Sequence, residues 1–401
     1  MRELPPTAGL PLRWRDLLTG GPTRFAQDVA EFLGLPELLV TSSGSAALVV
    51  ALATLREASP ERKKVVVPAF TCPLVALAIR QAGLAVVPCD LVPGGLDMDP
   101  AALRRHCDPE TLAVLPTHLA GRVADVAPAL AAARSAGAFV IEDAAQALGA
   151  TAAGGPVGSQ GDIGFYSLAA GKGLTLFEGG LLTARDSALR RALARHAARL
   201  LPVAWPMELR RAAQLVGYAA LYRPGLLAFA YGRRVRRALR RGDILGAAGD
   251  RFASTIPLHA VGGWRQRAGS AALRRLPRFL AVQATQAARR RAVLAAVPGV
   301  HIFADRPGER GTWPVLLLRL PDGVARDAVL DRLWGAGLGL SPLFVRALPD
   351  HPDLAGCVPM AEVPAARDLA ARSLCLGNSS WLTEAELGRV RDVLLGATSA
   401  S

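Results

Sequence analysis

The sequence predicts an α/β fold built on a mostly parallel sheet. Short apolar runs alternate with stretches of helical periodicity, and the runs are KVVVPAF, LAVVPCDL, LAVLPTHLAG and AFVIEDAAQALGA. Apolar strands that alternate with helices are typical of βαβ units, in which helices cover both faces of the sheet. Neither GxGxxG nor GxxxxGK[ST] follows any of these strands, which argues against a dinucleotide-binding fold and a P-loop nucleotidase.

The composition is that of a folded protein with more than one domain. The chain has 401 residues, of which 51% are hydrophobic and 20% are charged, so it is long enough to bury a substantial core. The net charge is +14, but no basic stretch is interleaved with aromatic residues as a single-strand binder requires. We therefore expect no nucleic-acid partner. The first residues lack the apolar region of a signal peptide, which predicts a cytoplasmic protein.

The cysteines predict neither disulfides nor a metal site. There are five of them, an odd number, and no two form a CxxC pair. Such thiols are typical of buried or incidental positions in a reducing compartment.

The stretch GDIGFYSLAAGKGLTLFEGG, residues 161–180, carries an unusual lysine. The chain has three lysines, and Lys63 and Lys64 lie in a charged ERKK turn that water surrounds. Lys172 instead lies between two glycines, with few long side chains beside it. A desolvated amine loses its proton more easily and becomes a nucleophile. Lys172 is therefore a candidate catalytic residue, and the alternative is a lysine in a surface loop.

The stretch ELLVTSSGSAALVVALATL predicts a short strand followed by a helix that begins at small residues. Gly44 and Ser45 lie where this helix starts. Free backbone N–H groups at the positive end of a helix bind anions, and phosphate in particular. The alternative is an ordinary serine N-cap without a ligand.

Two acids end the apolar strand in AFVIEDAAQALGA. Because side chains alternate along a strand, Glu142 and Asp143 should point in opposite directions. One of them should lie at the carboxyl edge of the sheet, where open α/β folds bind ligands. A carboxylate in that place can hold a protonated ring nitrogen. The alternative is an acid that caps the next helix.

Six motifs occur in a fixed order: SSGSAAL, VVVPAFTCP, PTHLAGRVAD, VIEDAAQALGA, GSQGDIGFYS and GKGLTLFEGG. Together they resemble the DegT/DnrJ/EryC1/StrS family of pyridoxal-phosphate-dependent aminotransferases. The resemblance covers residues 20–185 and returns more faintly in SPLFVRALPDHPDL and ARSLCLGNSSWLTEAELGRVRDVLL. It implies a fold-type-I transferase, with a large α/β domain whose sheet is mixed but mostly parallel, and a smaller α+β C-terminal domain.

The resemblance implies pyridoxal 5′-phosphate as the cofactor. Lys172 matches the lysine that is linked covalently to it. Asp143 matches the aspartate that keeps the pyridine nitrogen protonated, so that the ring accepts electrons. The remaining matches are further cofactor-binding positions: Gln146 beside the ring, Gly44 and Ser45 in the phosphate-binding turn, and Ser167 as a second phosphate ligand.

The resemblance also implies a reaction. Sugar dehydratases of the family carry histidine at the position of Lys172, so a lysine favours amino transfer. The expected function is transfer of an amino group from an amino-acid donor to a nucleotide-linked keto sugar, in polysaccharide or secondary-metabolite biosynthesis, by a homodimer. Two alternatives stay open: a pyridoxal-phosphate reaction on a lipid-linked or non-sugar carbonyl at a membrane surface, and an inactive membrane-peripheral scaffold.

Two positions depart from the family pattern. Where members often place an aromatic side chain over the cofactor ring, this chain has Cys72. Phe70 should point away from the ring, and His118 is a candidate for its cover. The family's asparagine that reaches the partner subunit's cofactor phosphate is absent from LHAVGGWRQRAGSAAL. The candidates to replace this asparagine are His259, Trp264 and Arg265.

Residues 207–243 form an insertion between the two expected domains. The apolar stretch 212–230 is interrupted by Arg223 and Pro224, and six arginines follow within residues 233–241. The interruption argues against a membrane-spanning helix. An apolar segment beside an arginine cluster instead fits the surface of an anionic membrane. The alternative is a helical hairpin buried against the dimer partner.

The chain thus divides into three predicted parts. They are a large cofactor-binding α/β domain at residues 1–200, a basic and apolar helical insertion at 201–254, and a small α+β domain at 255–401. Residues 265–291 are expected to form one long basic helix that leads into the small domain.

Overall fold

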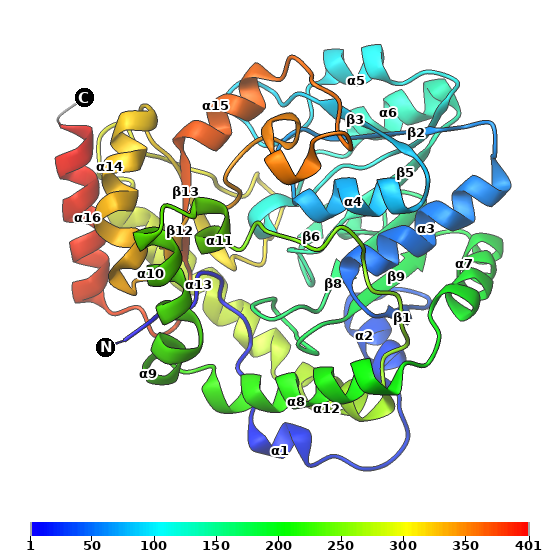
Figure 1. Ribbon diagram of the computed structural model, residues 1–401, viewed down its shortest axis with the longest axis horizontal. Coiled ribbons are helices and arrows are strands. Elements are labelled where there is room, and N and C mark those ends of the chain that lie inside the picture. The colour runs from blue at the N-terminus through cyan, green and yellow to red at the C-terminus, as the bar shows by residue number, and fades with distance from the viewer. Residues whose placement is uncertain (1, 400–401) are drawn as a thin grey trace.

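The computed structural model describes residues 2–399 and places two sheets in separate halves of the molecule (Figure 1). The larger sheet has seven strands in the order β1-β9-β8-β5-β4-β2-β3. Both pairings of β9 are antiparallel and the others are parallel, which confirms the predicted mixed, mostly parallel sheet. Its strands are β1 (Leu39–Thr41), β2 (Lys64–Pro68), β3 (Ala85–Cys89), β4 (Thr111–Val114), β5 (Phe139–Asp143), β8 (Ile163–Ser167) and β9 (Gly180–Ala184).

Helices cover both faces of this sheet because its strands are apolar on both sides. In β2, Val65 and Val67 share a buried cluster with α3 and α4, whereas Val66 shares one with α5 and α6. Alternate side chains of a strand point to opposite faces, so an unbroken valine run needs apolar partners on each face. The elements of this half also include α1 (Trp14–Leu17), α2 (Phe25–Leu33), α3 (Gly44–Ala58), α4 (Pro73–Gln81), α5 (Pro100–His106), η1 (Leu119–Gly121), α6 (Ala127–Ala136), β6 (Thr151–Ala152), β7 (Gly155–Pro156) and α7 (Ser187–Leu200).

The smaller sheet is antiparallel and lies in the C-terminal part of the chain. Its strand order is β10-β11-β13-β12. Leu316 and Leu318 of β11 share a buried cluster with Val329 of α14 and Val390 of α16, so helices cover this sheet as well. This arrangement confirms the predicted α+β domain. Its elements are β10 (His301–Ile302), β11 (Val315–Arg319), α14 (Gly323–Leu333), η3 (Trp334–Ala336), β12 (Leu340–Ser341), η4 (Leu348–Asp350), η5 (Pro352–Leu354), α15 (Pro364–Arg372), β13 (Ser373–Gly377) and α16 (Glu384–Thr398).

The segment between the two sheets is helical and packs on both halves. Leu215 and Tyr218 of α8 are buried with side chains of β8 and β9, whereas Val235 of α10 is buried in the core of the smaller domain. No helix within residues 2–399 combines the length and apolarity needed to span a bilayer. The elements of this segment are α8 (Trp205–Leu221), α9 (Pro224–Leu227), the π-helical turn η2 (Ala228–Gly232), α10 (Arg233–Arg240) and α11 (Ile244–Ala248).

The N-terminal residues and α12 cross the predicted domain borders. Leu4 is buried in the core of the smaller domain, and from there the chain runs to α1, which lies beside α8 (Figure 1). Ala268 of α12 is buried in the core of the larger domain. Segments on either side of the borders after residues 200 and 254 thus share cores, and the borders themselves stay predictions.

The expectation of one long helix over residues 265–291 is wrong. The chain turns at Arg274 and Arg275, between α12 (Gly263–Leu273) and α13 (Leu276–Leu294). Pro277 lies in the first turn of α13. Proline lacks an N–H and clashes with the preceding helical turn, so it is tolerated where a helix begins and not in a helix interior.

A buried ion pair ties α8 to α12. Arg265 has no exposed surface. Its guanidinium donates to both carboxylate oxygens of Glu208, with 2.8 Å between Nε and Oε1, and to the backbone carbonyls of Leu176 and Glu178. Removing one partner of such a pair leaves the other charge uncompensated, which costs about 3–5 kcal/mol.

Replacing Glu208 with alanine should therefore destabilise the whole chain. We expect Glu208→Ala to lower the free energy of unfolding by about 3 kcal/mol in urea denaturation. The matched control is Glu362→Ala, because the Glu362 side chain is 97% exposed and surface substitutions change stability by about 0.5 kcal/mol or less. Equal effects of the two substitutions would contradict this account of the ion pair.

Candidate active site

One cavity lies at the carboxyl edge of the larger sheet. Asp143 ends β5, Ser167 ends β8, and Gly44 begins the helix that follows β1. Because neighbouring parallel strands end at the same edge, residues far apart in the sequence meet there. The cavity has a volume of about 440 Å³, and its lining includes all six predicted site residues: Gly44, Ser45, Asp143, Gln146, Ser167 and Lys172.

The loop that carries Lys172 is held from two sides. Gly171 has a φ of +82°, and a Cβ atom there would lie 2.4 Å from the Thr7 hydroxyl oxygen. A Cβ atom at Gly9 would lie 2.9 Å from the Lys172 carbonyl oxygen and 3.0 Å from the Tyr218 hydroxyl oxygen. Glycine permits both the left-handed backbone and these close approaches. The N-terminal segment and α8 together therefore fix the position of the lysine loop.

Burial shifts the pKa values of Lys172 and Asp143 in opposite directions. It lowers the pKa of Lys172, although the nearby Asp143 favours the charged amine. It raises the pKa of Asp143, although the N–H of Ala145, which donates to Oδ1 over 2.9 Å, lowers it in part. An amine with a lowered pKa is more nucleophilic at neutral pH. A buried carboxyl group is stabilised by a cationic partner.

The predicted anion site lies at the first turn of α3. The Ala46 N–H donates to the Ser43 hydroxyl oxygen over 3.0 Å, so an ordinary serine N-cap is present, at Ser43. Gly44 is buried, and a Cβ atom there would lie 3.1 Å from the Ser167 Cβ atom. This approach places the Ser167 hydroxyl beside the helix N-terminus. Both supply the donors that a phosphate group requires.

Gln146 is fixed in the cavity wall by two other segments. The Ala120 N–H donates to the Gln146 Oε1 over 2.7 Å. The Thr312 hydroxyl donates to the Gln146 carbonyl oxygen over 3.0 Å. The loop after β4 therefore orients this side chain, whereas Thr312 holds the backbone of Gln146.

Glu142 points away from the cavity, as the strand alternation predicts. Its carboxylate is fully buried and accepts three backbone N–H bonds, from Gly158, Gln160 and Gly161. His118 Nε2 lies 3.0 Å from the Glu142 Oε2, and its Nδ1 accepts from the Ala124 N–H. Burial raises the pKa of Glu142, but the hydrogen bonds from His118 and the backbone lower it overall. Because both ring nitrogens are engaged and His118 does not line the cavity, the hypothesis that it covers the cofactor ring is wrong.

Besides Phe165 of β8, two aromatic side chains line the cavity from distant parts of the chain. Cys72 does line the cavity, and burial raises the pKa of its thiol to about 12. Phe70 points elsewhere and packs edge-on against Phe344, with 5.5 Å between ring centroids. Phe344 itself lines the cavity, as does Phe252. Phe344 lies within the SPLFVRALPDHPDL motif, but no local spacing links it or Phe252 to β2, so the sequence did not indicate that either lines the cavity.

The three candidates for the missing asparagine differ in whether a polar side-chain atom is left without a hydrogen-bond partner. Arg265 is saturated by Glu208 and backbone carbonyls, and Trp264 Nε1 donates to the Leu17 carbonyl over 3.1 Å. The His259 Nε2 is buried and has no hydrogen-bond partner within residues 2–399. That His259 reaches the cofactor phosphate of a partner subunit therefore stays a prediction.

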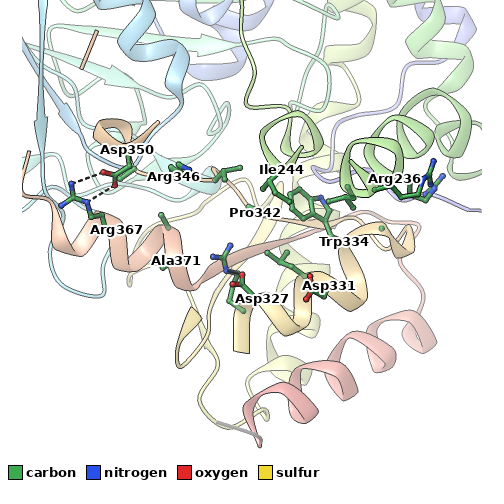
Figure 2. Close-up of a pocket in the computed structure, with 18 residues that line it drawn as sticks. Arg236, Ile244, Asp327, Asp331, Trp334, Pro342, Arg346, Asp350, Arg367 and Ala371 are labelled. Atoms are coloured by element: carbon green, nitrogen blue, oxygen red, sulfur yellow. Dashed lines mark hydrogen bonds and ion pairs between the residues drawn. The ribbon is translucent and has the colours of Figure 1, made fainter. Parts of the chain in front are cut away.

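A larger groove lies away from these residues (Figure 2). It has a volume of about 1020 Å³ and lies between α10, α11 and the smaller domain, and no predicted site residue lines it. Arg367 donates to both carboxylate oxygens of Asp350 over 2.9 and 3.1 Å, and Arg236 pairs with Glu3. These charges neutralise one another. The smaller cavity is the candidate active site, because nucleophile, carboxylate and anion-binding groups converge there.

The two sheets and the cavity at the carboxyl edge define a fold-type-I transferase. The solved structure of the aminotransferase TlmJ from Streptoalloteichus hindustanus has the same fold, with a TM-score of 0.72 and 24% identity over 95% of this chain and 92% of that one. The solved structure of Spr1654 from Streptococcus pneumoniae gives a TM-score of 0.75 and 17% identity over 98% and 99% of the two chains. Residues 15–200 match the DegT/DnrJ/EryC1/StrS aminotransferase family.

Curated relatives align with less than half of the chain. GDP-perosamine synthase of Caulobacter vibrioides is 34% identical over 165 residues, which are 41% of this chain and 44% of that enzyme. L-glutamine:2-deoxy-scyllo-inosose aminotransferase of Micromonospora echinospora is 36% identical over 200 residues, 48% and 47% of the two chains. The aligned part thus spans less than half of each relative's length.

The buried setting of Lys172 predicts an abnormal titration. Hydrogen bonds from Lys64 to Asp108 and Glu110 raise the pKa of Lys64, whereas burial lowers that of Lys172. After reductive ¹³C-methylation of the amines, NMR should show the Lys172 resonance titrating at a lower pH than the Lys64 resonance. The variants Lys172→Arg and Lys64→Arg assign the signals. A Lys172 resonance that titrates at or above the pH of Lys64 would refute the desolvated amine.

Proposed function

We propose that the protein is a pyridoxal 5′-phosphate-dependent aminotransferase that transfers an amino group from an amino-acid donor to a keto sugar. The observation that carries this proposal is the convergence of Lys172 and Asp143 in one cavity, beside the contact between Gly44 and Ser167. The match of residues 15–200 to an aminotransferase family supports it.

The donor set of the cavity fits this cofactor. Lys172 offers an amine for the covalent link, and Asp143 offers a buried carboxylate for the protonated pyridine nitrogen. Ser45, Ser167 and the first N–H groups of α3 would hold the phosphate, and Gln146 would lie beside the ring. When bound, the cofactor supplies a ring that accepts electrons from the substrate carbon.

Lys172 also suits the proton transfer that transamination requires. Its lowered pKa gives a larger neutral fraction at a given pH, so Nζ can accept the proton from Cα of the amino donor. The protonated Nζ can then donate a proton to the acceptor carbon that receives the amino group. Asp143 would hold the ring nitrogen, and the positive charge of that nitrogen would offset the burial of the carboxylate and keep it ionised.

The proposed acceptor is a nucleotide-linked keto sugar. Relatives named GDP-perosamine synthase and UDP-N-acetyl-3-dehydro-alpha-D-glucosamine 3-aminotransferase support this class. The second candidate is a cyclic ketone without a nucleotide, which the name of the 2-deoxy-scyllo-inosose aminotransferase favours. Spectral titration of the aminated cofactor form with both classes of ketone would decide between them. A homodimer in the cytoplasm belongs to the same proposal, and sedimentation velocity tests the dimer.

Removing the lysine tests the enzyme most simply. Wild-type protein mixed with pyridoxal 5′-phosphate should gain a near-visible absorbance band, and Lys172→Ala should lack it. Amino transfer by Lys172→Ala should fall by at least about 10²–10⁴-fold, the usual contribution of a general acid–base group. Lys63→Ala is the control and should keep both band and rate, because Lys63 lies in the ERKK turn. A wild-type protein without the band would refute the proposed function.

We also propose that the insertion contacts an anionic membrane surface. Trp205 and Leu209 are 70% and 68% exposed and lie four residues apart, on one face of α8, and Phe229 of η2 is 60% exposed. The Arg233 guanidinium lies over the Phe229 ring, 4.4 Å from its centroid. Apolar side chains beside arginines are the pattern of a peripheral membrane contact.

Vesicle flotation tests this contact. Deleting residues 207–243 would remove the core side chains Leu215 and Tyr218, so point substitutions are the better probe. We expect the wild type to float with vesicles rich in phosphatidylglycerol. The triple variant with serine at positions 205, 209 and 229 should float several-fold less, because each side chain removed takes apolar area from the contact.

The control replaces two exposed residues of the smaller domain, Val324 and Met360, with serine; they are 78% and 76% exposed. It should float like the wild type. Equal flotation of the triple variant and the wild type would rule out this membrane contact.

A further inference from the structure

The cavity that holds Lys172 takes part of its wall from the insertion. Arg211 of α8 lines it, together with Glu178 from the loop before β9. Lys172 and Arg211 are the two cationic side chains that line the cavity in the described part of the chain. If Lys172 is used for the covalent link, Arg211 is the cation left for the charge of a bound anion.

Arg211 is partly committed to protein partners. Its Nη1 donates to the Gln214 side-chain oxygen over 2.8 Å, and its Nη2 pairs with the Glu178 carboxylate. Its Nε is buried and has no hydrogen-bond partner within residues 2–399. The Arg211 side chain is 15% exposed. Its Nε–H donor is therefore removed from water but makes no hydrogen bond within the protein. Such an atom gains from a ligand that accepts its hydrogen bond.

The Arg211–Glu178 pair lies near the phosphate-binding groups. Gly180 pairs with Ser167 across β8 and β9, and a Cβ atom at Gly180 would lie 2.3 Å from the Ser43 carbonyl oxygen. Glu178 precedes Gly180 by two residues, which span at most about 7 Å of extended chain. The arginine paired with Glu178 lines the same cavity as Ser43 and Ser167.

The fold holds α8 in this place. Glu208, one turn before Arg211, is bound by the buried Arg265, which also donates to the backbone carbonyl of Glu178. The insertion and the loop before β9 are thus tied together directly beside the cavity. An arginine presented from such an anchored helix is preorganised for an anion.

We infer that Arg211 is a phosphate ligand of the cofactor site. Together with Ser167 and the N-terminus of α3, it neutralises the phosphate group from within the same chain, in place of the asparagine that residues 258–273 do not contain. Arg265 does not serve this purpose, because Glu208 and two carbonyls already occupy its donors. This inference rests on the proposed function, since it assigns a ligand to the cofactor of that reaction.

Paired binding measurements test the inference without any turnover. The dissociation constants of pyridoxal 5′-phosphate and of pyridoxal, which lacks the phosphate, are measured by absorbance titration. Arg211→Ala should weaken pyridoxal 5′-phosphate about ten- to a hundredfold, the range for a lost charged hydrogen bond, and leave pyridoxal within about twofold. Arg210→Ala is the matched control, because Arg210 is exposed on the same helix and does not line the cavity.

A second variant changes affinity in the opposite direction. Glu178→Gln removes a carboxylate that repels a phosphate and competes for Arg211, so pyridoxal 5′-phosphate should bind several-fold more tightly. General damage to the fold would weaken binding in both variants.

Three results would overturn the inference. They are an unchanged affinity in Arg211→Ala, an equal loss for pyridoxal and pyridoxal 5′-phosphate, and a loss confined to the amino-acid donor. Wild-type protein that forms no adduct with either aldehyde would instead overturn the proposed function, and with it this assignment.

Discussion

The position of Lys172 depends on close packing against its loop by chain segments from elsewhere in the fold. Gly171 has no room for a side chain beside Thr7, and Gly9 has none beside Lys172 and Tyr218. Such contacts bury Gly171 and hold the backbone of the loop in place. The lowered pKa of the amine follows from this enclosure. A change in the N-terminal segment or in α8 would therefore alter the chemistry of the lysine without touching it.

This dependence gives the insertion a structural role. Leu215 and Tyr218 of α8 complete the core beneath the lysine loop, and Val235 of α10 completes the core of the smaller domain. Arg211 and Phe252 come from the same part of the chain and line the cavity. One segment thus joins two domains, supports the nucleophile and forms a wall of the site. The exposed apolar side chains of this segment do not take part in these roles and form the proposed membrane contact.

The sequence predicted the parts of the site that local pattern determines. Asp143, Ser167 and Gly44 each lie where a strand ends or the helix after it begins, and an apolar run followed by small or polar residues marks such points. Parallel strands then bring these ends to one edge. The alternation along β5 also separated Glu142 from Asp143 correctly, because the period of a strand is fixed at two.

Sequence patterns did not predict the contacts between distant segments. Arg211, Phe252 and Phe344 line the cavity only because α8, the chain before α12 and the smaller domain fold over it. His118 was a reasonable candidate as a polar residue at a strand end, but Glu142 on the next strand binds it behind the cavity. The helix break at Arg274 was missed because basic periodicity outweighed the signal of Pro277.

Lys172 alone should bond covalently to the cofactor, and because the chain has only three lysines this can be measured directly. Protein incubated with pyridoxal 5′-phosphate, reduced with borohydride and digested can be mapped by mass spectrometry. The account predicts one modified peptide, containing Lys172, among the three lysines at positions 63, 64 and 172. Modification at Lys63 or Lys64 to the same extent, or at no lysine, would contradict it.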